Sequence, residues 1–115
     1  MATGTGEILP TRDTLTLTVY DGVTMSQNGS SLERYGNIAI LNLSFRLSST
    51  YATDSWVSVY TMPIGPRDMI YQQVYDATNN QTIYLRLSSG GYLSINSPTV
   101  STSWIRTIIP FVIKP

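Results

Sequence analysis

Apolar residues recur at every second position along most of the chain, which is the period of a β-strand with one buried face. Within residues 13–19, Leu15, Leu17 and Val19 alternate with threonines. The longest such run, residues 38–47, has one fully apolar face, formed by Ala39, Leu41, Leu43, Phe45 and Leu47. Its other face begins with Ile38 and Ile40 and ends with Arg46. We therefore expect a long strand whose second face is covered at one end only.

Further strands are expected after the long one, each bounded by turn residues. They cover residues 55–62, 68–75, 81–87, 92–95 and 103–114. The glycines of the segment SSGG, between two of these strands, tolerate positive φ and predict a hairpin. Pro110 cannot donate to a strand ladder, so it predicts an edge strand or a bulge. No window of 11 or more residues has the apolar spacing of an amphipathic helix.

This pattern predicts an all-β protein: an antiparallel β-sandwich or jelly-roll-like single domain with seven to nine short strands. A chain of 115 residues has the usual length of one domain. Residues 1–12 are rich in glycine and threonine near their start and have no apolar period, so we expect a flexible N-terminal tether there. Residues 13–115 are then the single β-sandwich domain.

The charge of the chain limits its partners. Seven basic residues balance seven acidic ones, and the arginines are scattered rather than clustered. Binding of nucleic acid or of an anionic membrane surface needs a basic patch, so neither is expected. The start of the chain lacks the basic and apolar regions of a signal peptide, and the most apolar run is too short to span a bilayer. We expect synthesis in the cytoplasm without a signal peptide, and no membrane insertion.

The residue types also argue against catalysis. The chain has no histidine and no cysteine, so it lacks both the base of a Ser-His-Asp triad and the usual ligands of zinc. Its carboxylates stand singly in turns or at strand ends, where such groups commonly bond their own backbone. We therefore predict that the protein is not an enzyme and has no catalytic residue, no metal site and no cofactor.

The aromatic residues suggest binding instead. Eight tyrosines and two tryptophans supply flat surfaces with a polar group, which suit sugar rings as well as protein interfaces. Three loops combine them with polar groups that bond hydroxyls. The candidate saccharide-binding residues are Tyr51, Asp54, Trp56, Arg67, Asp68, Tyr75 and Asp76. In the alternative interpretation, the aromatic residues fill the core and subunit interfaces while the polar ones only shape turns.

Four segments in order carry a resemblance to a known family. They are RYGNIAILNLSFRLSS, WVSVYTMPIGPRD, TIYLRLSSGGYLSI and WIRTIIPFVIKP. Over Leu32 to Pro115 this order resembles the C-terminal head domains of phage tail fibres and baseplate receptor-binding proteins from phages of Gram-positive bacteria. The matching positions are Gly36-Asn37, Trp56, Met62-Pro63, Arg86-Leu87 with Gly90-Gly91, and Trp104. The turn TMPIGPRDM departs from the more usual Leu-Pro-Gly-Tyr-x-Pro type, and the region before Ser31 has no counterpart.

The resemblance implies a homotrimeric knob on a phage tail tip or baseplate, attached to other tail or baseplate proteins of the virion. It implies binding of cell-wall or surface polysaccharide of the host bacterium, with avidity from three sites. Ile38 and Ile40 would pack near the three-fold axis, and Arg46 would reach solvent or a neighbouring subunit. A purely structural virion connector or decoration domain is the alternative, and a carbohydrate-binding module of a secreted enzyme is a third interpretation.

Overall fold

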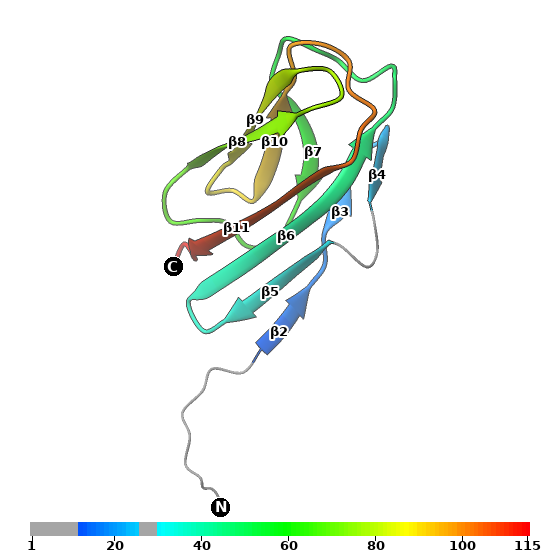
Figure 1. Cartoon of the computed structure of the whole chain (residues 1–115). Coiled ribbons are helices and arrows are strands. Elements are labelled where there is room, and N and C mark those ends of the chain that lie inside the picture. Colours follow the sequence, from blue (N-terminus) through cyan, green and yellow to red (C-terminus); the bar gives the residue numbers. More distant parts are fainter. Residues whose placement is uncertain (1–11, 26–29) are drawn as a thin grey trace, which may run out of the picture.

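The computed structural model describes residues 12–25 and 30–115, which form strands and connecting loops (Figure 1). The strands are β2 (Arg12–Leu15), β3 (Thr18–Val19), β4 (Val23–Met25), β5 (Ser31–Tyr35), β6 (Ile38–Leu47), β7 (Val57–Thr61), β8 (Ile70–Asp76), β9 (Gln81–Leu87), β10 (Tyr92–Asn96) and β11 (Ile105–Val112). The expected tether over residues 1–12 lies outside the described residues, apart from Arg12, which begins β2. In the described part of the chain, no helix is long and apolar enough to cross a membrane.

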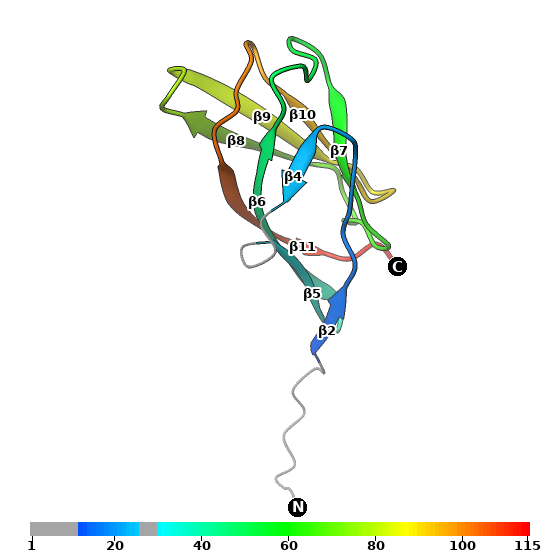
Figure 2. The same cartoon turned by 90° about the vertical axis from the view of Figure 1, so that its right-hand side faces the viewer.

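The strands form two antiparallel sheets of five strands each. The first sheet has the order β11-β6-β5-β2, with β4 paired to the end of β6, and the second has the order β3-β7-β10-β9-β8. The two sheets lie one behind the other in Figure 1, and the quarter turn in Figure 2 shows them from the side. The predicted all-β sandwich is confirmed.

The described strands number ten, against the seven to nine expected, partly because the first alternating segment is divided between the sheets. Leu15 of β2 pairs with Leu32 in the first sheet, whereas Thr18 of β3 pairs with Thr61 in the second. The chain therefore passes from one sheet to the other within residues 16–17. Alternation has the same period in one strand or in two successive ones, so the pattern alone could not show this break.

The core lies between the sheets and follows the predicted face of the long strand. Ala39, Leu41 and Phe45 of β6 are fully buried. The second sheet meets them with the fully buried side chains Ile83, Leu85, Leu87, Leu93, Val59 and Tyr60. The rings of Phe45 and Tyr60 meet edge to face, with centroids 5.4 Å apart, so one aromatic pair joins the two layers.

The last strand is an edge strand, as Pro110 predicts. β11 pairs with β6 from Ile105 to Val112 and has no second partner among the described strands. The Gln72 side chain of β8 approaches its free edge, donating to Thr107 Oγ1 and, at 3.5 Å, to the Ile108 carbonyl. Pro110 has no N–H, and the Ile108 carbonyl accepts a hydrogen bond from Gln72. This edge therefore offers fewer free backbone donors and acceptors for pairing with a further strand.

Candidate functional site

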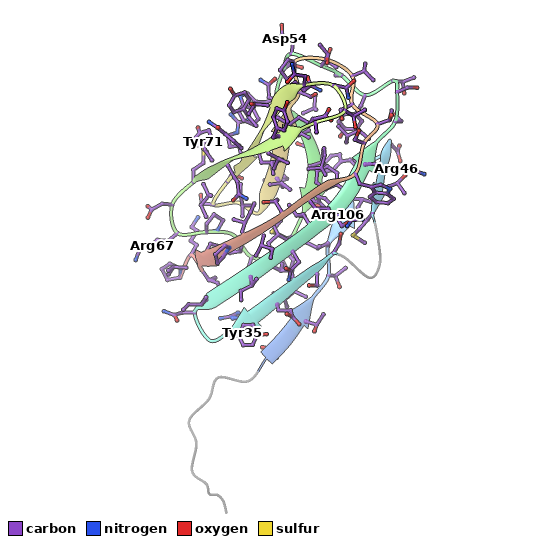
Figure 3. All side chains as sticks on the ribbon, viewed as in Figure 1. Tyr35, Arg46, Asp54, Arg67, Tyr71 and Arg106 are labelled. Atoms are coloured by element: carbon purple, nitrogen blue, oxygen red, sulfur yellow. The ribbon has the colours of Figure 1, made fainter. Side chains whose placement is uncertain are left out.

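The structure places the seven predicted saccharide-binding residues in three separate regions. Tyr51, Asp54 and Trp56 lie in the connection between β6 and β7, whereas Arg67 and Asp68 lie between β7 and β8. Tyr75 and Asp76 end β8. Figure 3 shows Asp54 at the top of the molecule and Arg67 far below it. Arg67 therefore lies apart from the Asp54 loop, so the seven residues do not all lie together.

Tyr51 supports its own loop. Its ring packs partly buried against the core and lies close to Gly22. Its hydroxyl donates a hydrogen bond to the Ser58 carbonyl. Burial, with a smaller contribution from Tyr20, raises the pKa of Tyr51. The hydroxyl and much of the ring are thus already engaged within the protein.

The charged loop residues differ in their surroundings. The Arg67 Nε atom lies 3.3 Å from Asp68 Oδ2, with both side chains largely exposed, so this salt bridge adds little stability. Asp54 is also exposed and adopts a positive φ of 56°, with its N–H bonded to the Ser97 carbonyl at 2.7 Å. That bond holds the Asp54 loop at the end of β10.

Asp76 is buried and organises a turn. Its carboxylate accepts hydrogen bonds from Asn79 Nδ2 at 2.8 Å and from Gln81 Nε2 at 3.0 Å, and the side chain is only 6% exposed. Burial favours the neutral acid, but the hydrogen bonds from Gln81 and Asn79 outweigh it and lower the pKa of Asp76 to about 2. The carboxylate is therefore ionised and satisfied inside the turn.

We expect Asp76→Asn to lower the free energy of unfolding by about 1.5–3 kcal/mol at pH 7, the range for hydrogen bonds to charged groups. Because the pKa falls from 3.8 to about 2 on folding, the stabilisation is complete above pH 3.8 and disappears as the pH falls through 2. Urea unfolding at pH 7 and at pH 2 measures both effects. Asp68→Asn changes an exposed carboxylate and serves as the control; it should leave the free energy of unfolding unchanged at both pH values. An equal loss of stability for Asp76→Asn at pH 7 and at pH 2 would contradict the prediction.

A pocket of about 240 Å³ lies beside Asp76, bordered by Tyr75, Thr78 and Trp104. The Tyr75 hydroxyl donates to Asn80 Oδ1. The Arg46 guanidinium carbon lies 5.2 Å from the centroid of the Trp104 ring. This pocket brings together two predicted residues and one tryptophan that the sequence interpretation had not assigned to a ligand.

A larger aromatic surface covers the outer face of the second sheet. The register sets Tyr71 opposite Arg86 and Gln73 opposite Tyr84, and all four alternate with residues that point toward the first sheet. Tyr71 is 65% exposed and Tyr84 is 42% exposed. We call this surface the aromatic platform and define it as Trp56, Tyr71, Gln73, Tyr84, Arg86 and Asn96.

Two specific contacts within the platform are made to the ring of Trp56. The Arg86 guanidinium carbon lies 4.4 Å from the centroid of the Trp56 ring, within range of a cation–π interaction. The Tyr71 ring meets the same indole nearly edge-on, with centroids 6.3 Å apart and an interplanar angle of 67°. Such a surface can stack a sugar ring on an aromatic face while amide and guanidinium groups bond its hydroxyls.

Of the platform residues, the sequence interpretation assigned only Trp56 to the ligand site. The sequence pattern predicts Tyr71 inside a strand, whereas the predicted ligand residues belong to loops and strand ends. The available signal was the polar face of residues 70–76 and 81–87, where tyrosine, glutamine and arginine occupy alternate positions. Only the pairing of β8 with β9 shows that these two faces are continuous.

The outer face of the first sheet carries a second feature. Ile38 is 47% exposed and Ile108 is 60% exposed, and the register sets Ile40 opposite Pro110 and Ile38 opposite Val112. We call Ile38, Ile40, Ile108, Pro110 and Val112 the apolar patch. Arg46 lies at the other end of β6 from Ile38, so the three residues expected at a trimer interface are not contiguous.

Comparison with known proteins gives no relative. No protein-family model matches the chain, and none of the curated proteins compared with it is similar. Within residues 12–25 and 30–115, no three acidic side chains come together in a way that could hold a metal ion. The functional argument therefore rests on the aromatic platform and the apolar patch.

Proposed function

We propose that the protein is a non-enzymatic host-recognition domain of a phage tail or baseplate, and that it binds bacterial cell-surface saccharide. The observation that carries this proposal is the arrangement of Trp56, Tyr71 and Arg86 on an exposed sheet face. The resemblance of four sequence segments to phage head domains supplies the biological setting. The location is then the virion, at the tail tip or baseplate.

The chemistry of the platform favours a saccharide over an apolar ligand. Its aromatic rings alternate with Gln73, Asn96 and Arg86, which offer amide and guanidinium groups at the same surface. A shallow aromatic surface with polar neighbours fits the apolar face and the hydroxyl rim of a sugar ring. An exposed sheet also leaves room for a polymer longer than one sugar.

The apolar patch supports the proposed homotrimer. Large aliphatic side chains on a sheet face are unfavourable in water unless another surface covers them. Ile38 and Ile40 were expected near a three-fold axis, and they border Val112 and Pro110 in this patch. The platform lies on the other sheet, so three copies joined through the patch would leave three platforms free for a repetitive polymer.

The same patch supports a second candidate function. A structural connector or decoration domain would bury the patch against another tail or baseplate protein and need no ligand. In that case the platform aromatics would also be buried between chains. The two candidates differ in what the loss of Trp56 changes: ligand binding in the first, assembly in the second.

We expect Trp56→Ala to weaken binding to immobilised wall polysaccharide from Gram-positive bacteria by about tenfold or more, the usual effect of removing a central aromatic. Light scattering coupled to size exclusion should give an unchanged mass. The matched control is Trp104→Ala, which removes the other tryptophan, outside the platform. A loss of binding in Trp104→Ala alone would move the site to the pocket beside Tyr75, and a changed mass in Trp56→Ala would favour the structural candidate.

A further inference from the structure

We propose that the aromatic platform selects acidic saccharides, with the Arg86 guanidinium binding a carboxylate or phosphate group of the ligand. This inference rests on the proposed saccharide binding and adds the ligand class. It follows from the position of Arg86, from the absence of a protein partner for its charge, and from the neutral residues around it.

The position of Arg86 is set by its neighbours. The residue lies on β9 between Tyr71 of β8 and Ser94 of β10, and it points to the outer face because Leu85 and Leu87 enter the core. Its guanidinium carbon stacks 4.4 Å from the centre of the Trp56 ring. The side chain is half-buried, so part of the usual conformational freedom of arginine is already lost before a ligand binds.

The charge of Arg86 has no partner in the described chain. Among residues 12–25 and 30–115, the guanidinium group forms no hydrogen bond and no salt bridge, and its ring contact with Trp56 is its one specific interaction. Arginine presents five N–H donors in a planar fork that matches a carboxylate or a phosphate. These donors are therefore free for a ligand.

Among the residues that the structure describes, no carboxylate around Arg86 neutralises its charge. The outward positions of β8, β9 and β10 carry tyrosine, glutamine, threonine, serine and asparagine. Asp54, in the loop beyond β10, is exposed and forms no salt bridge with Arg86. The centre of the platform is thus positively charged, whereas the remaining groups can bond neutral hydroxyls.

A ligand bound across the aromatic platform meets Arg86, because the guanidinium lies 4.4 Å over the Trp56 ring and Arg86 is paired with Tyr71 of β8 and Ser94 of β10. Covering an arginine with a neutral ring removes water from the charge without replacing it by an opposite charge, which is unfavourable. A carboxylate or phosphate on the sugar instead forms a charge-assisted pair with two parallel bonds. The stacked arrangement therefore disfavours neutral saccharides and favours acidic ones.

The other arginines described do not share this combination. Arg67 is paired with Asp68, and the Arg34 Nε atom donates to the Gly36 carbonyl at 2.8 Å. Arg46 also stacks on a tryptophan, but its side chain is exposed to water and lies on the other sheet. Arg86 is thus the described arginine that is half-buried, stacked and without an acidic partner.

The test uses the full chain and wall polysaccharide fragments from Gram-positive bacteria in three forms: untreated, carboxyl-reduced and dephosphorylated. We expect one treatment to weaken binding of the unchanged chain by about tenfold or more, the equivalent of a hydrogen-bonded charge pair. Arg86→Gln should bind treated and untreated fragments alike, and Arg86→Lys should recover only part of the preference. Arg106→Gln, a charge control on the other sheet, should behave as the unchanged chain.

The treatment that weakens binding identifies the group. An effect of carboxyl reduction assigns a carboxylate, and an effect of dephosphorylation assigns a phosphate. Equal binding of all three forms would overturn the acidic preference and leave saccharide binding standing, as would a preference that persists in Arg86→Gln. If no fragment bound the unchanged chain, the proposed function itself would fail, and the acidic preference with it.

Discussion

Replacing Phe45 with alanine is expected to lower the free energy of unfolding by about 3–5 kcal/mol, the usual range for removal of a buried phenylalanine. Phe45 is fully buried on β6, and its ring meets Tyr60 of the second sheet edge to face. Alanine would remove the ring from the core and from its contact with Tyr60, and it would leave a cavity between the sheets. Close-packed neighbours relax only partly into such a space, so the loss exceeds the transfer free energy of the ring alone.

Urea unfolding followed by tyrosine and tryptophan fluorescence measures this loss. The matched control is Tyr60→Phe, which keeps the facing ring and removes a buried hydroxyl that has no hydrogen-bond partner among the described residues. Its effect should stay within about 1 kcal/mol, the usual net contribution of a single neutral hydrogen bond. A loss below about 1 kcal/mol for Phe45→Ala would show that the two sheets do not pack through this aromatic pair.

Gly91→Ala is expected to lower the free energy of unfolding by about 2–4 kcal/mol, through backbone strain and a steric clash. Gly91 has a φ of +85°, a conformation that side chains disfavour. A Cβ atom there would lie 2.4 Å from the Met62 carbonyl oxygen, and that oxygen belongs to backbone. Relief would require moving Met62, whose N–H bonds the Gly91 carbonyl at 2.9 Å.

The neighbouring glycine provides a close control for this substitution. A Cβ atom at Gly90 would meet the Tyr92 ring at 3.3 Å and Ser88 Oγ at 3.9 Å, both in side chains, and Gly90 is exposed. Gly90→Ala should therefore change the stability much less than Gly91→Ala in the same thermal or urea unfolding experiment. Equal effects of the two substitutions would mean that the clash with Met62 is not what constrains the turn.

The sequence correctly predicted the features of the fold that depend on the local order of residues along a strand. The inward face of residues 38–47, the hairpin at SSGG and the edge position of Pro110 all follow from local rules, and the structure confirms them. Local rules succeed here because burial on a strand depends on alternation and because Pro110 lacks an N–H wherever the strand is placed. The division of residues 13–19 between two sheets had no such local signal.

The candidate site was predicted less well. Residues such as Arg67 and Asp54 looked like one site because each lies in a polar loop, yet the fold sets them far apart (Figure 3). Asp76 looked like a ligand group, but its carboxylate is occupied by Asn79 and Gln81. Loop composition shows which residues are polar, but it does not show which loops share an end of the sandwich.

The order of residues along the chain was enough to predict the all-β class, the core face of the long strand and the apolar start of its other face at Ile38 and Ile40. These properties depend on the order of side chains along one strand. The tertiary structure decided that Trp56, Tyr71 and Arg86 come together, because they lie on three segments whose neighbourhood exists only after β7, β10, β9 and β8 pair. Contacts between strands are set by register and sheet order, which depend on the whole chain at once.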